Sequence, residues 1–561
     1  MQAALTLLEA LYLHGLKQLV LCPGSRSGPL ALAAGLLASQ AKLQLFTAID
    51  ERSAAFLALG MATASGRAVA VVTTSGTAVA NLLPAAVEAD RSCQPLLLLT
   101  ADRPARLKNC GANQTVNQES FLLSACRWFG SGSVEGVHTQ TNDALSALAV
   151  QAWQQAQGAD GGAPGPVQLN LPFEEPLHSS LEQQQQVVSG ACPPKACAEP
   201  SLELSPPPRL NPELPGVVIA GPWRGLTPGL AAYQQAVHRW LSFSGWAVLA
   251  DPLAALGAEC PNRIEHWELQ LDGMNLPKDV QVLRLGPLPA SRRLETWLQR
   301  HRGPQLLITE GDPRPLDPLR CASQWSGGMA AWMAQQSLSD ATPKPSVGRN
   351  DLTQWIEKQL PLKGAVNEPA LAYWLPQLLP ERLPVMLAAS SPVRDWLTWS
   401  GPASSNHRCF SFRGASGIDG TLSLAMGLAA NLGPLALVTG DLALLHDSNG
   451  WLHASSSAAA PPLLVLLIDN SGGGIFQQLP IETPGFERLF AMPQQVDPLA
   501  LAAAHGVPGR QVACLDDLEQ ALAWGLSQQR PVLLRLCTDR GRDAALRPQL
   551  RAAAQNEGSV H

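Results

Sequence analysis

Two segments decide the fold of this chain: LALVTGDL at residues 435–442 and LLVLLIDNSGGGIF at residues 463–476. Each begins with an unbroken run of apolar residues and ends in a polar loop. Such runs, without alternation, are typical of parallel strands covered on both faces, and ligands gather at the carboxyl ends of these strands. The two segments therefore predict neighbouring buried strands with a ligand site at their ends.

The polar residues of the two loops have the chemistry of a cation site. Asp441 and Asn470 follow the two predicted strands, and a run of glycines begins at Gly472. A carboxylate, an amide oxygen and a backbone carbonyl suit a hard cation such as Mg²⁺, and glycines let the backbone approach a phosphate closely. The same residues also fit a simple strand-end turn followed by a flexible loop.

The composition indicates a multidomain globular protein. The chain has 561 residues, of which 46% are apolar and 15% charged, and this length allows three or four domains. A net charge of −6 without a basic stripe gives no reason to expect nucleic-acid binding. No apolar run approaches the ~18 residues that span a membrane. Eleven scattered cysteines and the lack of a basic leader favour a cytoplasmic protein with reduced thiols.

Strands and helices alternate along most of the chain. Apolar runs at 18–22, 43–48, 68–73, 96–100 and 167–171 predict a first α/β domain over residues 1–182. Runs at 216–221, 247–250, 280–285 and 305–309 predict a central domain over 216–336, and a third domain follows over 351–561. Proline-rich segments at 183–215 and 337–350 are interpreted as linkers. The predicted fold class is α/β, with three consecutive doubly wound parallel-sheet domains.

The opening motif resembles the thiamine diphosphate signature, which is Gly-Asp-x, a spacer in the mid-twenties and a pair ending in Asn. In this chain 26 residues, 443–468, separate Gly440-Asp441-Leu442 from Asp469-Asn470. Leu442 stands where Gly is commoner and Asp469 where Asn is commoner, and neither change touches the expected ligands. Three consecutive α/β domains are also the layout of thiamine diphosphate decarboxylase-like enzymes, which have a pyrimidine-binding, a central and a diphosphate-binding domain.

Five longer strings narrow the resemblance: CPGSRS at 22–27, TSGTAVAN at 74–81, LTADRP at 99–104, GANQ at 111–114 and RGASGIDG at 413–420. They resemble the family of 2-succinyl-5-enolpyruvyl-6-hydroxy-3-cyclohexene-1-carboxylate synthases of menaquinone and phylloquinone biosynthesis. That family decarboxylates 2-oxoglutarate on thiamine diphosphate and adds the succinyl-semialdehyde carbanion to isochorismate, with release of CO2. The resemblance implies a transferase that forms a carbon–carbon bond and needs Mg²⁺ or Mn²⁺. It also implies a homodimer with shared active sites, or a homotetramer.

The resemblance further implies which residues hold the cofactors. Glu51 is the expected catalytic carboxylate, because it matches the residue that hydrogen-bonds the pyrimidine ring. Asp441, Asn470 and Gly472 are the expected metal ligands. The other expected cofactor contacts are Ser75, Gly76, Thr77, Ser416, Ile418, Leu442, Gly473, Ile475 and Phe476.

The substrates of that family carry three carboxylates into one site, and arginine binds carboxylates bidentately without losing its charge. The resemblance matches six arginines to the family's basic positions, with Arg292 where many relatives have lysine. Any one of them alone would also fit a solvated surface position. The expected substrate contacts are Ser25, Arg26, Arg103, Asn113, Gln114, Arg292, Arg293, Ser390, Arg394, Arg413 and Leu479.

Three other interpretations remain open at this stage. An acetolactate synthase-like enzyme or a simple 2-oxo-acid decarboxylase would share the cofactor motif, but its pyruvate-type substrates need fewer arginines. A non-catalytic ligand-binding relative would be expected to lack Glu51, Asp441 or Asn470. A nicotinamide-dependent oxidoreductase is disfavoured because the glycines at 130, 132 and 136 have the wrong spacing for the dinucleotide fingerprint.

Overall fold

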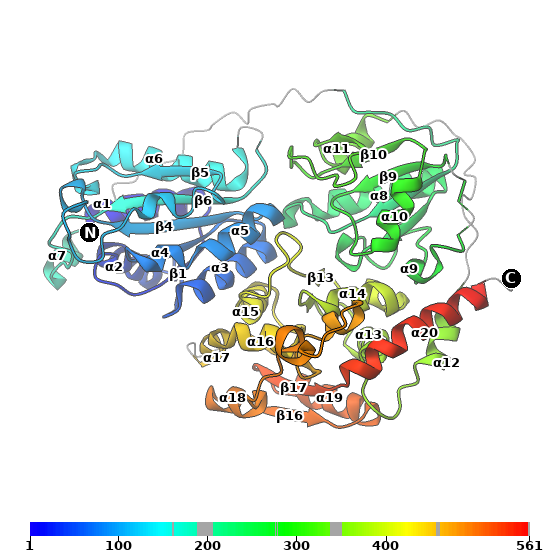
Figure 1. The fold of residues 1–561 in the computed structure, drawn as a ribbon. Coiled ribbons are helices and arrows are strands. Elements are labelled where there is room, and N and C mark those ends of the chain that lie inside the picture. The colour runs from blue at the N-terminus through cyan, green and yellow to red at the C-terminus, as the bar shows by residue number, and fades with distance from the viewer. Residues whose placement is uncertain are drawn as a thin grey trace. The chain divides into compact units, whose positions relative to one another are not determined.

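The computed structural model describes residues 1–159, 162–187, 206–274, 276–277, 279–336, 351–455 and 460–558 (Figure 1). Its named strands form three sheets, and neighbouring strands within each sheet are parallel. The predicted α/β fold class with three parallel sheets is confirmed. Residues 188–205 of the first predicted linker and the whole second linker, 337–350, lie outside the described residues.

The first sheet has the strand order β2-β1-β3-β4-β6-β5. Its inner strands β3, β4 and β6 are buried along their whole length, which explains their nearly continuous apolar sequence. The strands are β1 (Gln18–Leu21), β2 (Gln44–Thr47), β3 (Val69–Thr73), β4 (Leu96–Asp102), β5 (Trp128–Ser131) and β6 (Pro166–Pro172). The helices are α1 (Gln2–His14), α2 (Gly28–Ser39), α3 (Glu51–Ser65), α4 (Thr77–Ala80), α5 (Leu83–Ser92), α6 (Asn142–Gln157) and α7 (Leu181–Gln186).

The second sheet has the order β11-β10-β9-β7-β8. One of its two cores is built on Trp240, whose ring meets Trp246 and Trp332 edge-on at centroid distances of 5.3 and 4.8 Å. The strands are β7 (Gly216–Ala220), β8 (Ala247–Ala250), β9 (Gln281–Leu285), β10 (Gln305–Ile308) and β11 (Ser323–Trp325). The helices are α8 (Leu230–Ser244), α9 (Trp267–Gln270), α10 (Arg292–Arg300) and α11 (Met329–Ala334).

The third sheet has the order β13-β12-β14-β15-β17-β16. Its two central strands, β14 and β15, lie in the apolar segments at 435–442 and 463–476. The strands are β12 (Val385–Leu387), β13 (Cys409–Phe410), β14 (Leu435–Gly440), β15 (Leu463–Asp469), β16 (Gly509–Val512) and β17 (Val532–Cys537). The helices are α12 (Thr353–Gln359), α13 (Glu368–Leu378), α14 (Ser391–Trp399), α15 (Thr421–Leu432), α16 (Asp441–His446), α17 (Leu452–Ser455), α18 (Pro498–Ala504), α19 (Leu518–Ser527) and α20 (Arg540–Gly558).

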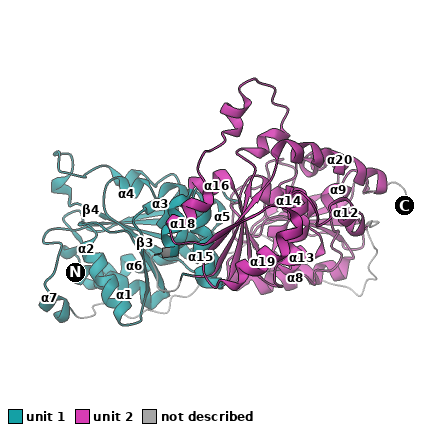
Figure 2. Cartoon of the chain, turned by 90° about the horizontal axis from the view of Figure 1, so that it is seen from below, with its two compact units in different colours: residues 1–202, 413–433, 447–460 teal, residues 203–412, 434–446, 461–561 magenta. Residues whose placement is uncertain are grey.

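The chain divides into two compact units, coloured teal and magenta in Figure 2. The first unit comprises Met1–Leu202, Arg413–Gly433 and Asp447–Ala460, and the second comprises Glu203–Phe412, Pro434–His446 and Pro461–His561. Helix α15 belongs to the first unit because it packs closely against α3. A Cβ on Gly60 would lie 2.2 Å from the carbonyl oxygen of Leu424, and a Cβ on Gly427 would lie 2.0 Å from that of Leu57. Only glycine allows this approach.

The part of the chain that the structure describes contains no helix with both the length and the apolar character needed to cross a membrane. The domain boundaries drawn from the linkers stay a prediction.

Candidate active site

The carboxyl ends of β14 and β15 carry a buried acidic group within the second unit. Gly440 of β14 pairs with Ile468 of β15, so the residues that follow the two strands lie at the same edge of the sheet. Asp441 Oδ1 accepts a hydrogen bond from the backbone N of Leu442 at 2.8 Å, and Oδ2 accepts one from the backbone N of Gly472 at 2.7 Å. Burial raises the pKa of Asp441 to about 6. A bound cation would reverse that shift, since a positive charge stabilises the carboxylate.

Asn470 presents an oxygen to the same region. Its side chain is 7% exposed, its Nδ2 donates to Glu368 Oε1 at 2.7 Å, and its buried Oδ1 has no hydrogen-bond partner among the described residues. A buried acceptor without a donor is costly unless a ligand satisfies it. Asp441, Asn470 and the backbone at Gly472 therefore fit a hard cation held by oxygen atoms.

Glycines of the loop after β15 are required by its close packing. Gly472 has a φ of +121°, and a Cβ on it would lie 2.0 Å from the carbonyl oxygen of Ala491. A Cβ on Gly474 would lie 2.4 Å from Asn470 Nδ2. The backbone N of Gly473 donates to the carbonyl oxygen of Ala491 at 2.6 Å. A side chain at Gly474 would displace Asn470, and one at Gly472 would push the loop away from Ala491.

The loop continues into a short helix, Gly474–Gln478, that leaves apolar side chains in solvent. Phe476 is 37% exposed and Leu479 is 40% exposed. Ile475 is half-buried, and the ring of Phe476 lies 5.8 Å from that of Phe490. The predicted contacts Ile475, Phe476 and Leu479 thus lie in the segment that directly follows the predicted metal ligands Asn470 and Gly472.

A second group of predicted residues gathers in the first unit, beyond the ends of β3 and β4. Arg103 Nη1 donates to Ser75 Oγ at 2.5 Å and to the carbonyl oxygen of Gln114 at 2.8 Å. Gln114 Nε2 donates to the carbonyl oxygen of Ser75 at 2.8 Å. Arg103 is 9% exposed and Arg26 is 6% exposed. Burial lowers the pKa of Arg103, and the positive charge of Arg26 lowers it further. Two buried guanidinium groups that repel each other form a favourable site for an anion.

The other predicted residues near this group are Arg26, Ser25 and Asn113. Arg26 Nη1 donates to the carbonyl oxygen of Phe173 at 2.8 Å, and its buried Nε has no partner among the described residues. Ser25 and Asn113 are the two predicted residues beside the group in sequence; Ser25 is exposed, and the carbonyl oxygen of Asn113 accepts from Thr115 Oγ1 at 3.4 Å.

Glu51 is the first residue of α3, after the predicted strand β2. The N-cap of that helix is Asp50, whose carboxylate accepts from the backbone N of Arg52 and of Ser53. Glu51 Oε2 accepts from Asn81 Nδ2 at 3.3 Å. Gly76, with a φ of +86°, precedes Thr77 at the start of α4. Asn81 therefore links Glu51 to the 74–81 segment that contains Gly76 and Thr77.

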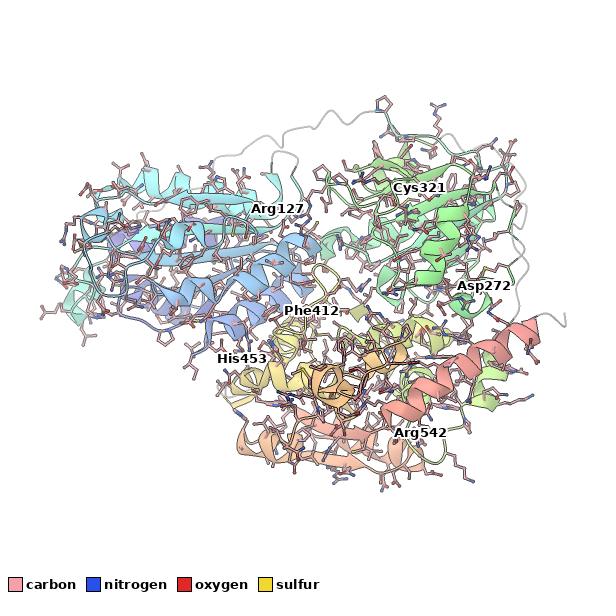
Figure 3. The ribbon with its side chains drawn as sticks, in the orientation of Figure 1. Arg127, Asp272, Cys321, Phe412, His453 and Arg542 are labelled. Carbon is pink, nitrogen blue, oxygen red and sulfur yellow. The ribbon has the colours of Figure 1, made fainter. Side chains whose placement is uncertain are left out.

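A cavity of about 380 Å³ opens next to Asp50 in the first unit. Ser53 Oγ lies 2.8 Å from His453 Nε2 there, and burial lowers the pKa of His453 to about 4, so the ring is neutral at pH 7 (His453 is labelled in Figure 3). None of the predicted site residues is among its lining residues, which are Leu21, Pro23, Thr47, Ala48, Ile49, Asp50, Ser53, Asn449, Leu452 and His453.

The segment 413–420, also in the first unit, is held by an acid that the sequence analysis did not single out. The carboxylate of Glu88 accepts from the backbone N of Gly414 at 2.8 Å and of Ala415 at 2.6 Å. Arg413 Nη1 donates to Ser416 Oγ at 3.5 Å. Ile418 contributes its carbonyl oxygen to Thr421 Oγ1 at 2.9 Å, at the start of α15.

The remaining predicted arginines lie in the second unit, and they differ in their partners. Arg394 Nη1 donates to the carbonyl oxygen of Ser390 at 2.6 Å, at the start of α14. Arg292 is the first residue of α10. Arg293 Nη2 donates to Asp272 Oδ2 at 2.6 Å, and its Nη1 donates to the carbonyl oxygen of Glu268 at 2.7 Å (Asp272 is labelled in Figure 3). Arg293 is thus paired with an acid within its own unit.

Two further polar side chains, Gln118 and Glu368, contact predicted residues and were not predicted from the sequence. Buried Gln118 accepts from the backbone N of Gly76 at 2.9 Å. Glu368, which holds Asn470, is bound in turn by Arg547 Nη2 at 2.5 Å. Burial and Asp395 raise the pKa of Glu368, and Arg547 opposes that shift. Neither contact has a local signal, because the partners are 42 and 102 positions apart in the chain.

Comparisons with known proteins define the class. The N-terminal TPP binding domain of thiamine pyrophosphate enzymes matches residues 1–121, and the C-terminal TPP binding domain matches residues 398–536. Benzoylformate decarboxylase from Polynucleobacter necessarius superposes with a TM-score of 0.70 at 16% identity, over 96% of this chain and 99% of that one. A thiamine diphosphate-dependent 4-hydroxybenzoylformate decarboxylase from Rhodococcus jostii RHA1 gives 0.68 at 15%, with the same coverage. The class is that of the thiamine pyrophosphate enzymes.

Closer relatives define the family. The chain is 83% identical over 559 residues to the 2-succinyl-5-enolpyruvyl-6-hydroxy-3-cyclohexene-1-carboxylate synthase of Synechococcus sp. (strain CC9605), with 100% of both chains covered. It is 67% identical over 543 residues to the synthase of the same name from Parasynechococcus marenigrum (strain WH8102), covering 96% of this chain and 99% of that relative. The chain belongs to this family of synthases. The predicted family, the thiamine diphosphate cofactor and the formation of a carbon–carbon bond are confirmed.

Proposed function

We propose that this enzyme decarboxylates 2-oxoglutarate and adds the remaining four-carbon unit to isochorismate, with Mg²⁺ or Mn²⁺ as the metal cofactor. The observation that carries the proposal is the meeting of Ser75, Arg103 and Gln114, which come from three separate segments of the first domain. Arg103 lies near Arg26, and two such cations match a substrate that carries two carboxylates. Pyruvate-type substrates would not need this charge.

Thiamine diphosphate, when bound, supplies the carbon nucleophile and accepts the electrons that decarboxylation releases. Asp441, Asn470 and the carbonyl of Gly472 would hold the metal that neutralises its diphosphate. Their fit is supported by the buried, unpartnered Oδ1 of Asn470 and by the hydrogen bond from the backbone N of Gly472 to Asp441 Oδ2, which brings the two loops together. The proposed task of Glu51 is to hold a proton at the pyrimidine ring of the cofactor.

The other predicted residues would bind the substrates or pack against the cofactor. Ile418, Ile475 and Phe476 would pack against the cofactor and exclude water, with Ser416, Leu442, Gly473, Gly76 and Thr77 as further contacts. Arg394 and Arg413 would bind the carboxylates of 2-oxoglutarate, and the cluster around Arg103 would bind isochorismate. Ser25, Asn113, Ser390, Leu479, Arg292 and Arg293 complete the proposed substrate contacts.

The test is an assay of the purified protein with thiamine diphosphate and Mg²⁺. We expect isochorismate to disappear and CO2 to be released when 2-oxoglutarate is present. Pyruvate in place of 2-oxoglutarate distinguishes the alternatives, because an acetolactate synthase-like enzyme or a decarboxylase would consume it. Consumption of pyruvate with no reaction of 2-oxoglutarate would contradict the proposal.

The proposal includes a cytoplasmic homodimer, or a homotetramer built from such dimers, in which Glu51 of one subunit serves the cofactor held by Asp441 of the other. Mixing E51Q with D441A after dissociation and reassociation tests this arrangement. A mixed dimer has one intact and one doubly defective site, so a 1:1 mixture should recover about a quarter of wild-type activity. No recovery, despite proven subunit exchange, would place each active site within a single chain.

A further inference from the structure

One buried hydrogen bond fixes the orientation of the Asn470 amide. Asn470 Nδ2 donates to Glu368 Oε1 at 2.7 Å, and the two side chains are 7% and 2% exposed. An amide has an NH₂ end and an oxygen end, and only one of them can face Glu368. With the NH₂ end there, Oδ1 is turned away from Glu368. This oxygen is the buried atom that has no partner among the described residues.

The C-terminal helix α20 determines which end faces Glu368. Arg547 Nη2 donates to Glu368 Oε2 and to Asp395 Oδ2, each at 2.5 Å, and Arg547 Nε donates to Asp395 Oδ1 at 2.9 Å. Arginine has no acceptor, so it must face carboxylate oxygens. Glu368 therefore offers its other oxygen as an acceptor, and the amide of Asn470 meets it with its donor end.

The same helix holds the backbone on both sides of this contact. Asp543 Oδ2 accepts from the backbone N of Glu368 at 3.2 Å. Arg540 Nη1 donates to the carbonyl oxygens of Asn470 at 3.2 Å and of Ser471 at 2.6 Å. Arg540, Asp543 and Arg547 have the i, i+3, i+7 spacing of one helix face. Glu368 and the loop of Asn470 are thus fixed against the same surface.

We propose that Glu368 is a positioning residue for the cation site: it holds the Asn470 amide so that Oδ1 is available to a divalent cation. The role rests on the proposed metal site of Asp441, Asn470 and Gly472. Partners that orient a metal ligand in this way typically change metal affinity by ~10–100-fold when they are removed. The competing explanation is that the Glu368–Arg547–Asp395 network only stabilises the packing of α20.

The variant E368Q separates the two explanations. The new side chain has nearly the same size, but its oxygen must face Arg547, which leaves its NH₂ group facing Asn470. The Asn470 amide must then turn and lose Oδ1 from the cation site. The affinity for Mn²⁺, measured from the free-ion EPR signal in the presence of thiamine diphosphate, should fall on the order of ten- to a hundredfold.

The matched control is D395N. It removes a carboxylate from the same arginine but leaves the bond between Glu368 and Asn470 in place. We expect D395N to lower the melting temperature about as much as E368Q and to keep Mn²⁺ affinity within about twofold of wild type. Equal losses of Mn²⁺ affinity in the two variants would overturn the positioning role.

A rescue keeps the test decisive if E368Q folds poorly. N470D alone places two carboxylates against each other, whereas E368Q/N470D lets the introduced amide donate to the introduced carboxylate. The double variant should bind Mn²⁺ about tenfold more tightly than either single variant. Additive losses would overturn the positioning role. Failure of the wild type to bind Mn²⁺ would instead overturn the metal site itself, so the two failures are distinguishable.

Discussion

The edge of the third sheet and the edge of the first sheet have the same architecture and opposite chemistry. At the ends of β14 and β15, Asp441 and Asn470 present oxygen acceptors. Beyond the ends of β1 and β4, Arg26 and Arg103 present donors. Burial raises the pKa of Asp441 to about 6 and lowers the pKa of Arg103, so burial disfavours the charged form of the side chain at each edge. We therefore expect a cation at the acceptor edge, formed by Asp441 and Asn470, and an anion at the donor edge, formed by Arg26 and Arg103.

We expect the largest effect from a substitution at the acceptor edge, where Asp441 and Asn470 follow β14 and β15. D441A would remove a proposed ligand of the metal at the cofactor's diphosphate, so the affinity for thiamine diphosphate with Mg²⁺ should fall on the order of a hundredfold or more. The measurement is thermal stabilisation by the cofactor, and EDTA should abolish it in the wild type. D469N is the control, because Asp469 pairs with Arg535 at 2.7 Å. If the cofactor stabilised D441A as much as the wild type, Asp441 would belong to a structural turn and not to a metal site.

Glu51 is an acid in the first unit, where the donor edge lies, and its removal should have the next largest effect. E51Q can still hydrogen-bond the pyrimidine ring but cannot stabilise its charged form, so turnover should fall by about 10²–10⁴ while cofactor binding persists. Hydrogen–deuterium exchange at the thiazolium carbon of the cofactor measures the step directly. Wild-type exchange in E51Q would remove Glu51 from the mechanism.

The sequence was sufficient to predict the buried strands β14, β15 and β4, because apolar runs are local features, whereas Arg26 and Arg103 were selected only through the family resemblance. The predicted strand at 247–250 coincides with β8, and the prediction of 68–73 differs from β3 by one residue. Strands were not predicted at β5, β11, β12, β13, β16 and β17; β5 and β11, for example, have four and three residues and little apolar periodicity. The packing of α15 on α3 and the contact of Glu368 with Asn470 depend on residues far apart in the chain, which no local pattern encodes.

Substitutions of Arg26 and Arg103, the donor edge, should impair the reaction with isochorismate. Substitutions of the arginines proposed to bind 2-oxoglutarate should impair the earlier decarboxylation. R26A and R103A would each remove a proposed charge-assisted contact with isochorismate, worth roughly 1.5–3 kcal/mol, so the KM for isochorismate should rise about ten- to a hundredfold. CO2 release from 2-oxoglutarate in a single turnover without isochorismate should remain close to wild type. R394A and R413A should slow that single turnover instead. Equal slowing in all four variants would mean that the arginines form one undivided site.

Arg26 contacts the exposed Glu175 at 3.5 Å, whereas two acids lie 2.6 and 3.7 Å from the guanidinium of Arg293, so Arg293 should show the smallest effect. Its guanidinium donates to Asp272 Oδ2 at 2.6 Å, and the Asp272 side chain is 62% exposed. Because the guanidinium of Arg293 is bound to Asp272, R293A should change kcat/KM for isochorismate by no more than about fivefold, which corresponds to about 1 kcal/mol. The matched variant D272N releases Arg293 without removing it. If Arg293 binds isochorismate only after leaving Asp272, D272N should lower the KM, and R293A should raise it by tenfold or more. Steady-state kinetics of the two variants therefore decide whether Arg293 belongs with the donor edge or serves only to tie α10 to Asp272.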